Sequence, residues 1–184
     1  MPIELSPGMT MNALARTAPG ARRALFRAYH IGGCASCGFR AEETLEEVCA
    51  RNDALDVQEA IRTITEAHAQ DEVMLLHPGE AARLKESDAD STRFLDIRSR
   101  EEFDAVQIPG STHFTQEMMQ EIVGTWPRET GAIIIVDHTG DRALDAAAYF
   151  GGHGFSNIRA LRGGIDAWCA QVDPSMPRYE LEMA

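Results

Sequence analysis

The sequence has 184 residues, of which 44% are hydrophobic and 25% are charged, and its formal net charge at pH 7 is −12. These values are typical of a globular chain of one or two domains. Because an acidic surface repels phosphate groups and the sequence has no run of Lys and Arg, we expect no nucleic-acid partner and no membrane association. No apolar stretch approaches the roughly 20 residues that span a bilayer, and no basic segment followed by an apolar one opens the chain, so we expect a cytoplasmic protein.

The amino-terminal part of the chain divides into an arm and a helical region. Residues 1–18 contain proline and glycine without sustained hydrophobic periodicity, which predicts a flexible arm. Over residues 19–70 the apolar residues recur at helical spacing, which predicts a small all-α domain. Its first helix begins near residue 21 and carries Leu25, Phe26 and Tyr29 on one face.

Two further helices are expected in this domain. Thr44 and Glu47 have the residue types and the spacing of a capping box, which predicts a helix that begins at Thr44. The alternative is a helix that begins earlier, at Glu42 or Glu43. The third helix is predicted over residues 57–69, because its apolar residues fall three or four positions apart.

A glycine-flanked turn between the first two helices carries Cys34-Ala35-Ser36-Cys37. Glycines let the backbone bend so that the two thiols converge, and the start of a following helix lowers the pKa of a nearby thiol. In a chain expected to be cytoplasmic, four cysteines favour reduced thiols, a redox pair or a metal site over a disulfide framework. Cys34 and Cys37 are therefore the candidate redox or sulfur-handling residues.

The same cysteines are also candidate metal ligands. Two thiolates supply half of a tetrahedral zinc site or of an iron–sulfur cluster site, so a homodimer could share one such centre between two Cys34–Cys37 pairs. His30 and Cys49 could add ligands within one chain. The alternatives are that His30 is merely packed or exposed, that Cys49 packs as a small core residue, and that the turn has no thiol chemistry. We expect Cys169 to be structural.

From about residue 73 to 172, strands alternate with helices, which predicts an α/β domain with a parallel sheet and helices on both faces. The predicted strands cover residues 94–97, 133–136 and 157–161. The predicted helices cover residues 101–105, 116–124, 143–150 and 164–171. Pro174 and Pro177 predict an irregular tail over residues 173–184.

Four separated motifs of this region, in this order, resemble the rhodanese (sulfurtransferase) family. They are Phe94-Leu95-Asp96-Ile97-Arg98 with Glu101-Glu102-Phe103, then Ile108-Pro109-Gly110-Ser111, the loop of residues 137–142, and Leu161-Arg162-Gly163-Gly164-Ile165-Asp166-Ala167-Trp168. The resemblance implies a rhodanese-like sheet with the active-site loop at residues 137–142.

The first position of that loop departs from the family pattern. Family members carry a nucleophilic cysteine there, with Gly at the fourth position and Arg at the sixth. This sequence keeps Gly140 and Arg142 but has Asp137 at the first position. Because a carboxylate cannot carry sulfane sulfur, the resemblance implies that two-step transfer through an enzyme persulfide is absent from this loop. Loop amides that donate to Asp137 would favour its anion, and we expect Arg142 to add a salt bridge.

We favour a locked, non-catalytic loop in which Asp137 takes the place of a bound anion. The alternative is that Asp137 is a nucleophile toward phosphoryl or acyl groups, but only Asp141 provides a second nearby carboxylate and no lysine is adjacent. We expect His138 to be exposed to solvent, and Thr139 completes the loop. Gln107, at a position where family members often have histidine, also favours a non-catalytic domain.

The segment of residues 30–39 and the helix after it resemble a second family. This is a small helical domain of unknown function that occurs alone or fused to sulfur-metabolism and rhodanese modules, and it is similar to the amino-terminal domain of iron–sulfur cluster repair proteins. The resemblance covers about residues 20–65. It implies a sulfur or redox context for Cys34 and Cys37.

The expected function is that of a sulfur or redox accessory or binding protein that has a protein partner in sulfur or redox metabolism. Thiol or metal chemistry would belong to Cys34 and Cys37, and the α/β domain would serve recognition or dimerisation. One alternative is a sulfurtransferase that uses Cys34 or Cys37 as sulfur acceptor, with the Asp137 loop only binding substrate. The other is a pure protein-interaction module.

Overall fold

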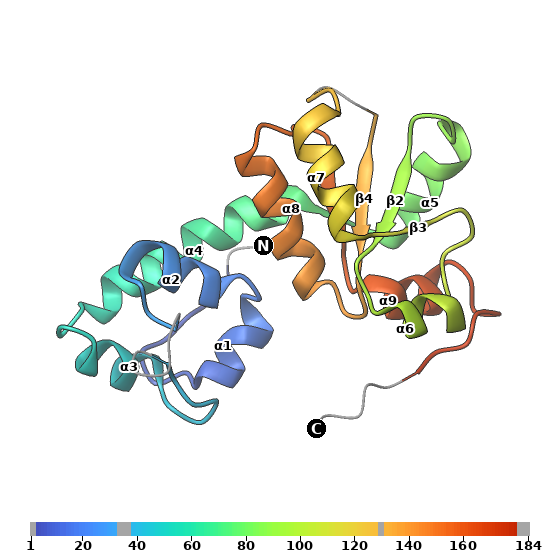
Figure 1. Cartoon of the computed structure of the whole chain (residues 1–184). Helices are drawn as coiled ribbons and strands as arrows, with labels where there is room; N and C mark the ends of the chain where they lie inside the picture. The colour runs from blue at the N-terminus through green and yellow to red at the C-terminus, as the bar shows by residue number, and fades with distance from the viewer. Residues whose placement is uncertain (1–2, 33–37, 129–130, 180–184) are drawn as a thin grey trace. The chain divides into compact units, whose positions relative to one another are not determined.

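The structure is a computed structural model that describes residues 3–32, 38–128 and 131–179 (Figure 1). The chain divides into two compact units, Met1–Val73 and Met74–Ala184. Within the described ranges, no helix is both long enough and apolar enough to span a membrane.

The described part of the first unit is helical, as predicted. Its helices are α1 (Met11–Thr17), α2 (Ala21–Tyr29), α3 (Leu45–Arg51) and α4 (Val57–Met74), the last of which runs five residues beyond its predicted end. They share one hydrophobic cluster, whose fully buried members are Leu14, Leu25, Leu45, Val48, Ala60 and Ile64. Phe26 was expected on the packed face of α2 but is 47% exposed.

The capping box at α3 is present, so this helix begins at the predicted residue and not at Glu42 or Glu43. The Thr44 hydroxyl accepts a 3.3 Å hydrogen bond from the Glu47 amide. The Glu47 carboxylate accepts a 2.9 Å hydrogen bond from the Thr44 amide. Two backbone donors at the start of α3 are thereby satisfied within four residues of sequence.

The expectation of a flexible arm over residues 1–18 is wrong, because α1 lies inside it. The Thr10 hydroxyl caps this helix by accepting a 3.2 Å hydrogen bond from the Ala13 amide. Met11, Leu14 and Ala18 are all buried in the core of the first unit. Seven helical residues are too few to show a convincing hydrophobic period, and burial against the rest of the unit stabilises them.

The second unit contains the predicted parallel sheet, in the strand order β1-β5-β4-β2-β3. The strands are β1 (Leu75–Leu76), β2 (Arg93–Asp96), β3 (Thr112–His113), β4 (Ile133–Val136) and β5 (Ile158–Leu161). The helices are α5 (Pro78–Ser87), α6 (Arg100–Ala105), α7 (Gln116–Thr125), α8 (Asp141–Gly152) and α9 (Gly164–Gln171). The two short strands at the edges, β1 and β3, were not predicted.

Helices cover both faces of the sheet because alternate residues of the central strand β4 enter two different cores. Ile133 and Ile135 pack in a cluster with residues of α7 and α8, among them Ile122 and Phe150. Ile134 and Val136 pack in a second cluster with residues of α5 and α9, among them Ala81, Ile165 and Trp168. Since all strands are parallel, their carboxyl ends meet at one edge of the sheet, which is where ligand sites form in open α/β sheets.

Candidate functional site

The loop of residues 137–142 joins the carboxyl end of β4 to α8, as predicted. Gly140 precedes the first residue of α8 and has φ +98, a left-handed conformation that favours glycine. A Cβ at Gly140 would stand 2.8 Å from the Gly163 amide nitrogen, because the loop packs against the turn between β5 and α9. Glycine at this position therefore satisfies both the turn and the close approach of two backbone segments.

The Asp137 side chain lies inside this loop and is only 2% exposed. Its Oδ1 atom accepts a 2.6 Å hydrogen bond from the Gly140 amide. Its Oδ2 atom accepts a 2.9 Å hydrogen bond from the Arg142 amide. Asp137 is thus held by backbone amides of its own loop and of the start of α8.

The net effect of this environment on Asp137 is opposite to the expected one. Burial raises the pKa of Asp137 above its ordinary value, and the amide hydrogen bonds from Gly140, Arg142 and Ala143 lower it only in part. The expectation that the loop favours the anion is therefore wrong in its net direction, because the desolvation of a buried carboxylate outweighs these three backbone donors.

Arg142 contacts the Asp137 carboxylate through its backbone amide and not through the expected salt bridge. Its side chain is exposed, whereas the Asp137 carboxylate is buried. Among the ion pairs of the described residues, none joins Arg142 to Asp137. Thr139 and Asp141 are also exposed, with 3.3 Å between the Thr139 hydroxyl and the Asp141 carboxylate.

His138 is half-buried, which corrects the expectation of a solvent-exposed side chain. Its ring centroid lies 4.6 Å from that of Tyr179, at an interplanar angle of 53°. Its Nδ1 atom is buried without a hydrogen-bond partner in the described part of the chain. The contact with Tyr179 covers one side of this ring.

The start of α9 holds the loop through its backbone. The Ile165 amide donates a 2.9 Å hydrogen bond to the Asp137 carbonyl, and the Asp166 amide donates a 3.2 Å hydrogen bond to the His138 carbonyl. Gly163 and Gly164 both have positive φ, which turns the chain into α9 at this point. Gly163 and Gly164 thus position the loop of residues 137–142.

Beside the loop, the Asp96 carboxylate and the Arg98 guanidinium form a buried ion pair at the end of β2. Arg98 Nε donates to Asp96 at 2.9 Å, and Arg98 Nη2 donates to Asp96 at 2.6 Å. Both side chains are 1% exposed or less. Arg98 also donates to the Val106 carbonyl at 2.6 Å, so the pair ties β2 to the end of α6.

Tyr179 is a residue of this region that the sequence did not indicate, since it lies in the segment predicted as an irregular tail. Its hydroxyl accepts a 2.8 Å hydrogen bond from Arg98 Nη1 and donates a 2.8 Å hydrogen bond to Glu102. Burial raises the pKa of Tyr179 to about 12. Up to residue 179 the segment has no helix or strand, as predicted, and these two hydrogen bonds of Tyr179 attach it to the site.

The proposed thiol site is not placed by the structure, because Cys34 and Cys37 lie outside the described residues. Cys49 and Cys169 are 1% and 2% exposed, and burial raises the pKa of both thiols. His30 is exposed at the end of α2, with its ring against Phe26. In the described ranges, no three side chains of the metal-binding types come together.

The family and the relatives found by comparison with known proteins match the second unit of the chain. A family model for the rhodanese-like domain matches residues 78–171, just over half of the chain. The chain is 28% identical over 93 residues to "Thiosulfate sulfurtransferase GlpE" of Pseudomonas entomophila (strain L48), which covers 50% of this chain and 82% of that protein. It is 30% identical over 91 residues to the protein of the same name from Pseudomonas aeruginosa (strain LESB58), which covers 50% of this chain and 79% of that protein.

Solved structures share the fold at low sequence identity. The crystal structure of reduced Bacillus anthracis CoADR-RHD aligns with a TM-score of 0.50 at 17% identity, over 66% of this chain and 21% of that chain. The matched residues 78–171 contain the sheet, the loop of Asp137 and the buried pair of Asp96 and Arg98. The chain belongs to the rhodanese-like domain family, because the family model matches residues 78–171 and the parallel sheet and the placement of this loop agree with that match.

Proposed function

We propose that this chain is a sulfur or redox accessory or binding protein whose rhodanese-like unit does not transfer sulfur at its own loop. One observation carries the proposal: the Asp137 carboxylate accepts hydrogen bonds from the Gly140 and Arg142 amides at 2.6 and 2.9 Å. These amides are the donors that would otherwise surround a substrate anion or a reactive sulfur atom. The loop therefore binds a fixed group of its own chain.

The chemistry of the side chain supports the same conclusion. Sulfane sulfur is carried on a thiolate, and a carboxylate forms no stable equivalent of a persulfide. Cys169 does not replace the missing thiol, because its side chain is buried in the α9 core and its Sγ atom faces the Pro177 carbonyl at 4.0 Å. Within the described residues, the loop thus has no sulfur nucleophile beside it.

Any thiol chemistry of the chain is assigned to Cys34 and Cys37 by elimination. The sequence has four cysteines, and two of them, Cys49 and Cys169, are buried with raised thiol pKa values. Reactive cysteines are accessible and have a lowered pKa. The glycine-flanked sequence Cys34-Ala35-Ser36-Cys37 has the residue pattern of such a pair.

A sulfurtransferase that uses Cys34 or Cys37 as acceptor is the second candidate function. The relatives named thiosulfate sulfurtransferase favour it, and they match the second unit, whereas both cysteines belong to the first unit. In this alternative the chain still has activity, but the activity depends on the cysteine turn and not on Asp137.

Transfer of sulfur from thiosulfate to cyanide separates these functions. We expect no activity for the wild type, for Asp137→Ser or for Cys34→Ser/Cys37→Ser, and a detectable persulfide at residue 137 by mass spectrometry for Asp137→Cys. Asp137→Ser is the matched control, since it removes the carboxylate without supplying a thiol. Activity of the wild type that is lost in Cys34→Ser/Cys37→Ser would instead establish the sulfurtransferase. A well-folded Asp137→Cys variant that takes up no sulfur would show that the loop amides are not competent for this chemistry.

Anaerobic purification with iron, zinc and acid-labile sulfide analysis tests the metal alternative at the same residues. Iron together with sulfide, both lost in Cys34→Ser/Cys37→Ser, would identify a cluster-binding protein. A metal-free protein with two titratable thiols at that turn would favour a dithiol redox role. Cys49→Ser is the control, because its buried side chain belongs to the core.

A further inference from the structure

The segment that follows α9, residues 173–179, has no helix or strand, yet its side chains are tied to the second unit at several points. Arg178 forms a two-point ion pair with Asp166 of α9, at 2.7 Å through Nε and 2.8 Å through Nη2. Met176 and Tyr179 pack against the core between the sheet and α9. The segment is thus a turn followed by an irregular peptide that lies on a folded surface.

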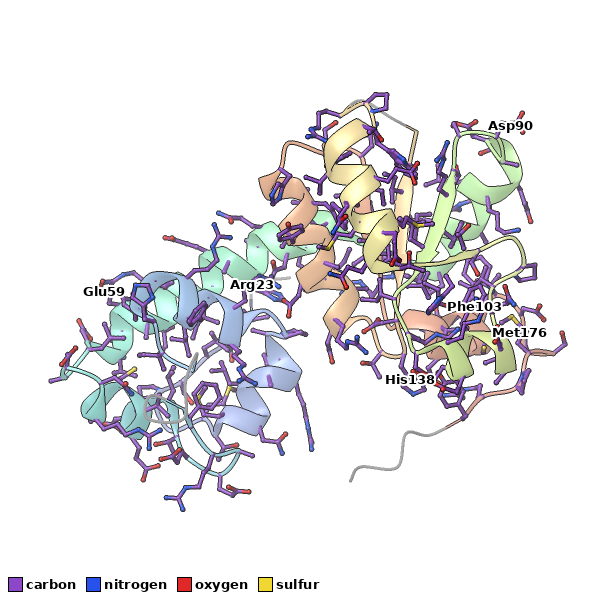
Figure 2. The ribbon with its side chains drawn as sticks, in the orientation of Figure 1. Arg23, Glu59, Asp90, Phe103, His138 and Met176 are labelled. Carbon is purple, nitrogen blue, oxygen red and sulfur yellow. The ribbon has the colours of Figure 1, made fainter. Side chains whose placement is uncertain are left out.

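Tyr179 brings this peptide to the loop of Asp137. Its hydroxyl is bonded to Arg98 after β2 and to Glu102 in α6, each at 2.8 Å. Its ring contacts the ring of His138, the residue next to Asp137, with 4.6 Å between centroids. Figure 2 labels His138 and Met176 in the part of the second unit where α6 and α9 lie.

The four contacted residues belong to one surface, because each lies at or near the carboxyl edge of the sheet. Asp166 and His138 are joined directly, since the Asp166 amide donates to the His138 carbonyl at 3.2 Å. Arg98 and Glu102 share the Tyr179 hydroxyl. Residues 173–179 therefore cross the side of the candidate site on which His138 lies.

We propose that residues 173–179 are a releasable strap that shields His138 and closes this side of the 137–142 loop. Release of the strap exposes the His138 ring and the loop rim to a partner. This inference does not depend on where the thiol chemistry of the chain lies, because all of its contacts are in the second unit.

One contact of the strap, and its backbone, are of the kind that open without global unfolding. The Arg178–Asp166 pair is largely exposed, with side-chain exposures of 57% and 35%, and such pairs contribute little to stability. The segment has no regular backbone hydrogen bonding of a helix or strand, a feature of locally opening regions. Arg98 keeps its three side-chain hydrogen bonds to Asp96 and its bond to the Val106 carbonyl when Tyr179 leaves, so the surface beneath the strap remains organised.

Acylation of histidine by diethyl pyrocarbonate, followed residue by residue with mass spectrometry, measures this opening in the full chain. His153 is exposed on the far end of α8 and serves as an internal reference. We expect the ratio of the His138 rate to the His153 rate to rise about tenfold in Arg178→Gln/Tyr179→Phe, the effect of losing one or two hydrogen bonds to charged groups on an opening equilibrium. Arg100→Gln is the matched control, since its exposed pair with Asp104 does not involve the strap. An unchanged ratio, or an equal rise in Arg100→Gln, overturns the proposal.

Hydrogen exchange of the wild-type protein tests the strap without any substitution. We expect peptides covering residues 173–179 to exchange earlier than the strands, and peptides covering the loop after β4 to share that faster exchange. Addition of a synthetic peptide of residues 173–179 to Arg178→Gln/Tyr179→Phe should restore the protection of His138. Protection of residues 173–179 equal to that of β4 overturns the proposal, because a segment that opens only with the sheet is not releasable.

Discussion

Gly164 lies so close to Asp137 that a Cβ at residue 164 would stand 2.5 Å from the Asp137 carbonyl oxygen. The same Cβ would stand 2.4 Å from the His138 carbonyl oxygen. The amide of the next residue, Ile165, donates a hydrogen bond to the Asp137 carbonyl at 2.9 Å. The start of α9 and the loop after β4 are thus joined backbone to backbone, with no room for a side chain between them.

This close approach predicts a large effect of Gly164→Ala. We expect the free energy of unfolding to fall by about 2 kcal/mol or more, because the methyl group collides with two carbonyls and φ is +59. Urea unfolding followed by circular dichroism measures the change. Gly151→Ala in α8 is the control: nothing lies within 4 Å of its Cβ position, and alanine in a helix adds up to about 1 kcal/mol. Equal losses in both variants would contradict the prediction.

The raised pKa of Asp137 predicts a pH dependence of stability. The folded state holds the proton of this carboxyl up to a higher pH than the unfolded state does. Between the two pKa values the folded state binds more protons, so the contribution of Asp137 to stability is full below the unfolded pKa and is lost as pH rises through the folded pKa. Asp137→Asn removes this pH dependence, so the wild type should lose stability relative to Asp137→Asn as pH rises above about 4, the ordinary pKa of an aspartate.

The same variant should be less stable than the wild type at neutral pH. The Asn side chain has one acceptor oxygen, so its NH2 group faces a backbone donor, such as the Gly140 or the Arg142 amide, and we expect a loss of about 1 to 3 kcal/mol. Urea unfolding at several pH values measures both effects. A difference between the two proteins that stays constant with pH would mean that Asp137 has the same pKa in both states.

The two arginine pairs near α6 should differ strongly in their contribution to stability. Arg98→Ala leaves the Asp96 carboxylate buried without its partner and should cost about 3 to 5 kcal/mol. Arg100→Ala breaks a pair whose side chains are 67% and 54% exposed, and should cost at most about 0.5 kcal/mol. Thermal and urea unfolding measure both. Similar losses in the two variants would mean that burial does not govern these pairs.

The burial of two thiols predicts the outcome of a titration with an aromatic disulfide reagent. We expect the native protein to show at most two fast thiols, and the urea-unfolded protein to show all four cysteines. Cys49 and Cys169 should react slowly because both are buried and their pKa values are raised. Cys169→Ser should leave the fast fraction unchanged, and a fast thiol that disappears in this variant would refute the assignment.

The sequence predicted the parallel sheet well because its strands carry strong local signals. Ile133–Val136 is a continuous apolar run of four fully buried residues, and the motif around Gly163 and Gly164 marks the start of α9 at the predicted residue. The capping box of Thr44 and Glu47 likewise marks the start of α3. Each of these features depends on residues within a few positions of one another.

The features that the sequence did not predict depend on distant contacts. The hydrogen-bond partners of Tyr179 lie 81 and 77 residues away along the chain, and no local pattern connects them. Helix α1 has only seven residues and is stabilised by burial in the core of its unit. For Asp137, the amide donors follow from the loop, but the direction of its pKa shift follows from its burial in the folded unit, which no local sequence pattern predicts.

The covalent attachment of the Asp137 carboxylate to its own loop has a consequence for ligand linkage. A tethered group competes with a dissolved one at a high effective concentration, roughly millimolar or above. A ligand raises the melting temperature only when it finds an empty site in the folded state. Thiosulfate or phosphate should therefore leave the melting temperature of the wild type unchanged at moderate concentrations, and should raise that of Asp137→Ala, whose amides at Gly140 and Arg142 no longer have the carboxylate as acceptor. The stability of the wild-type second unit should therefore not depend on the concentration of sulfur anions around it.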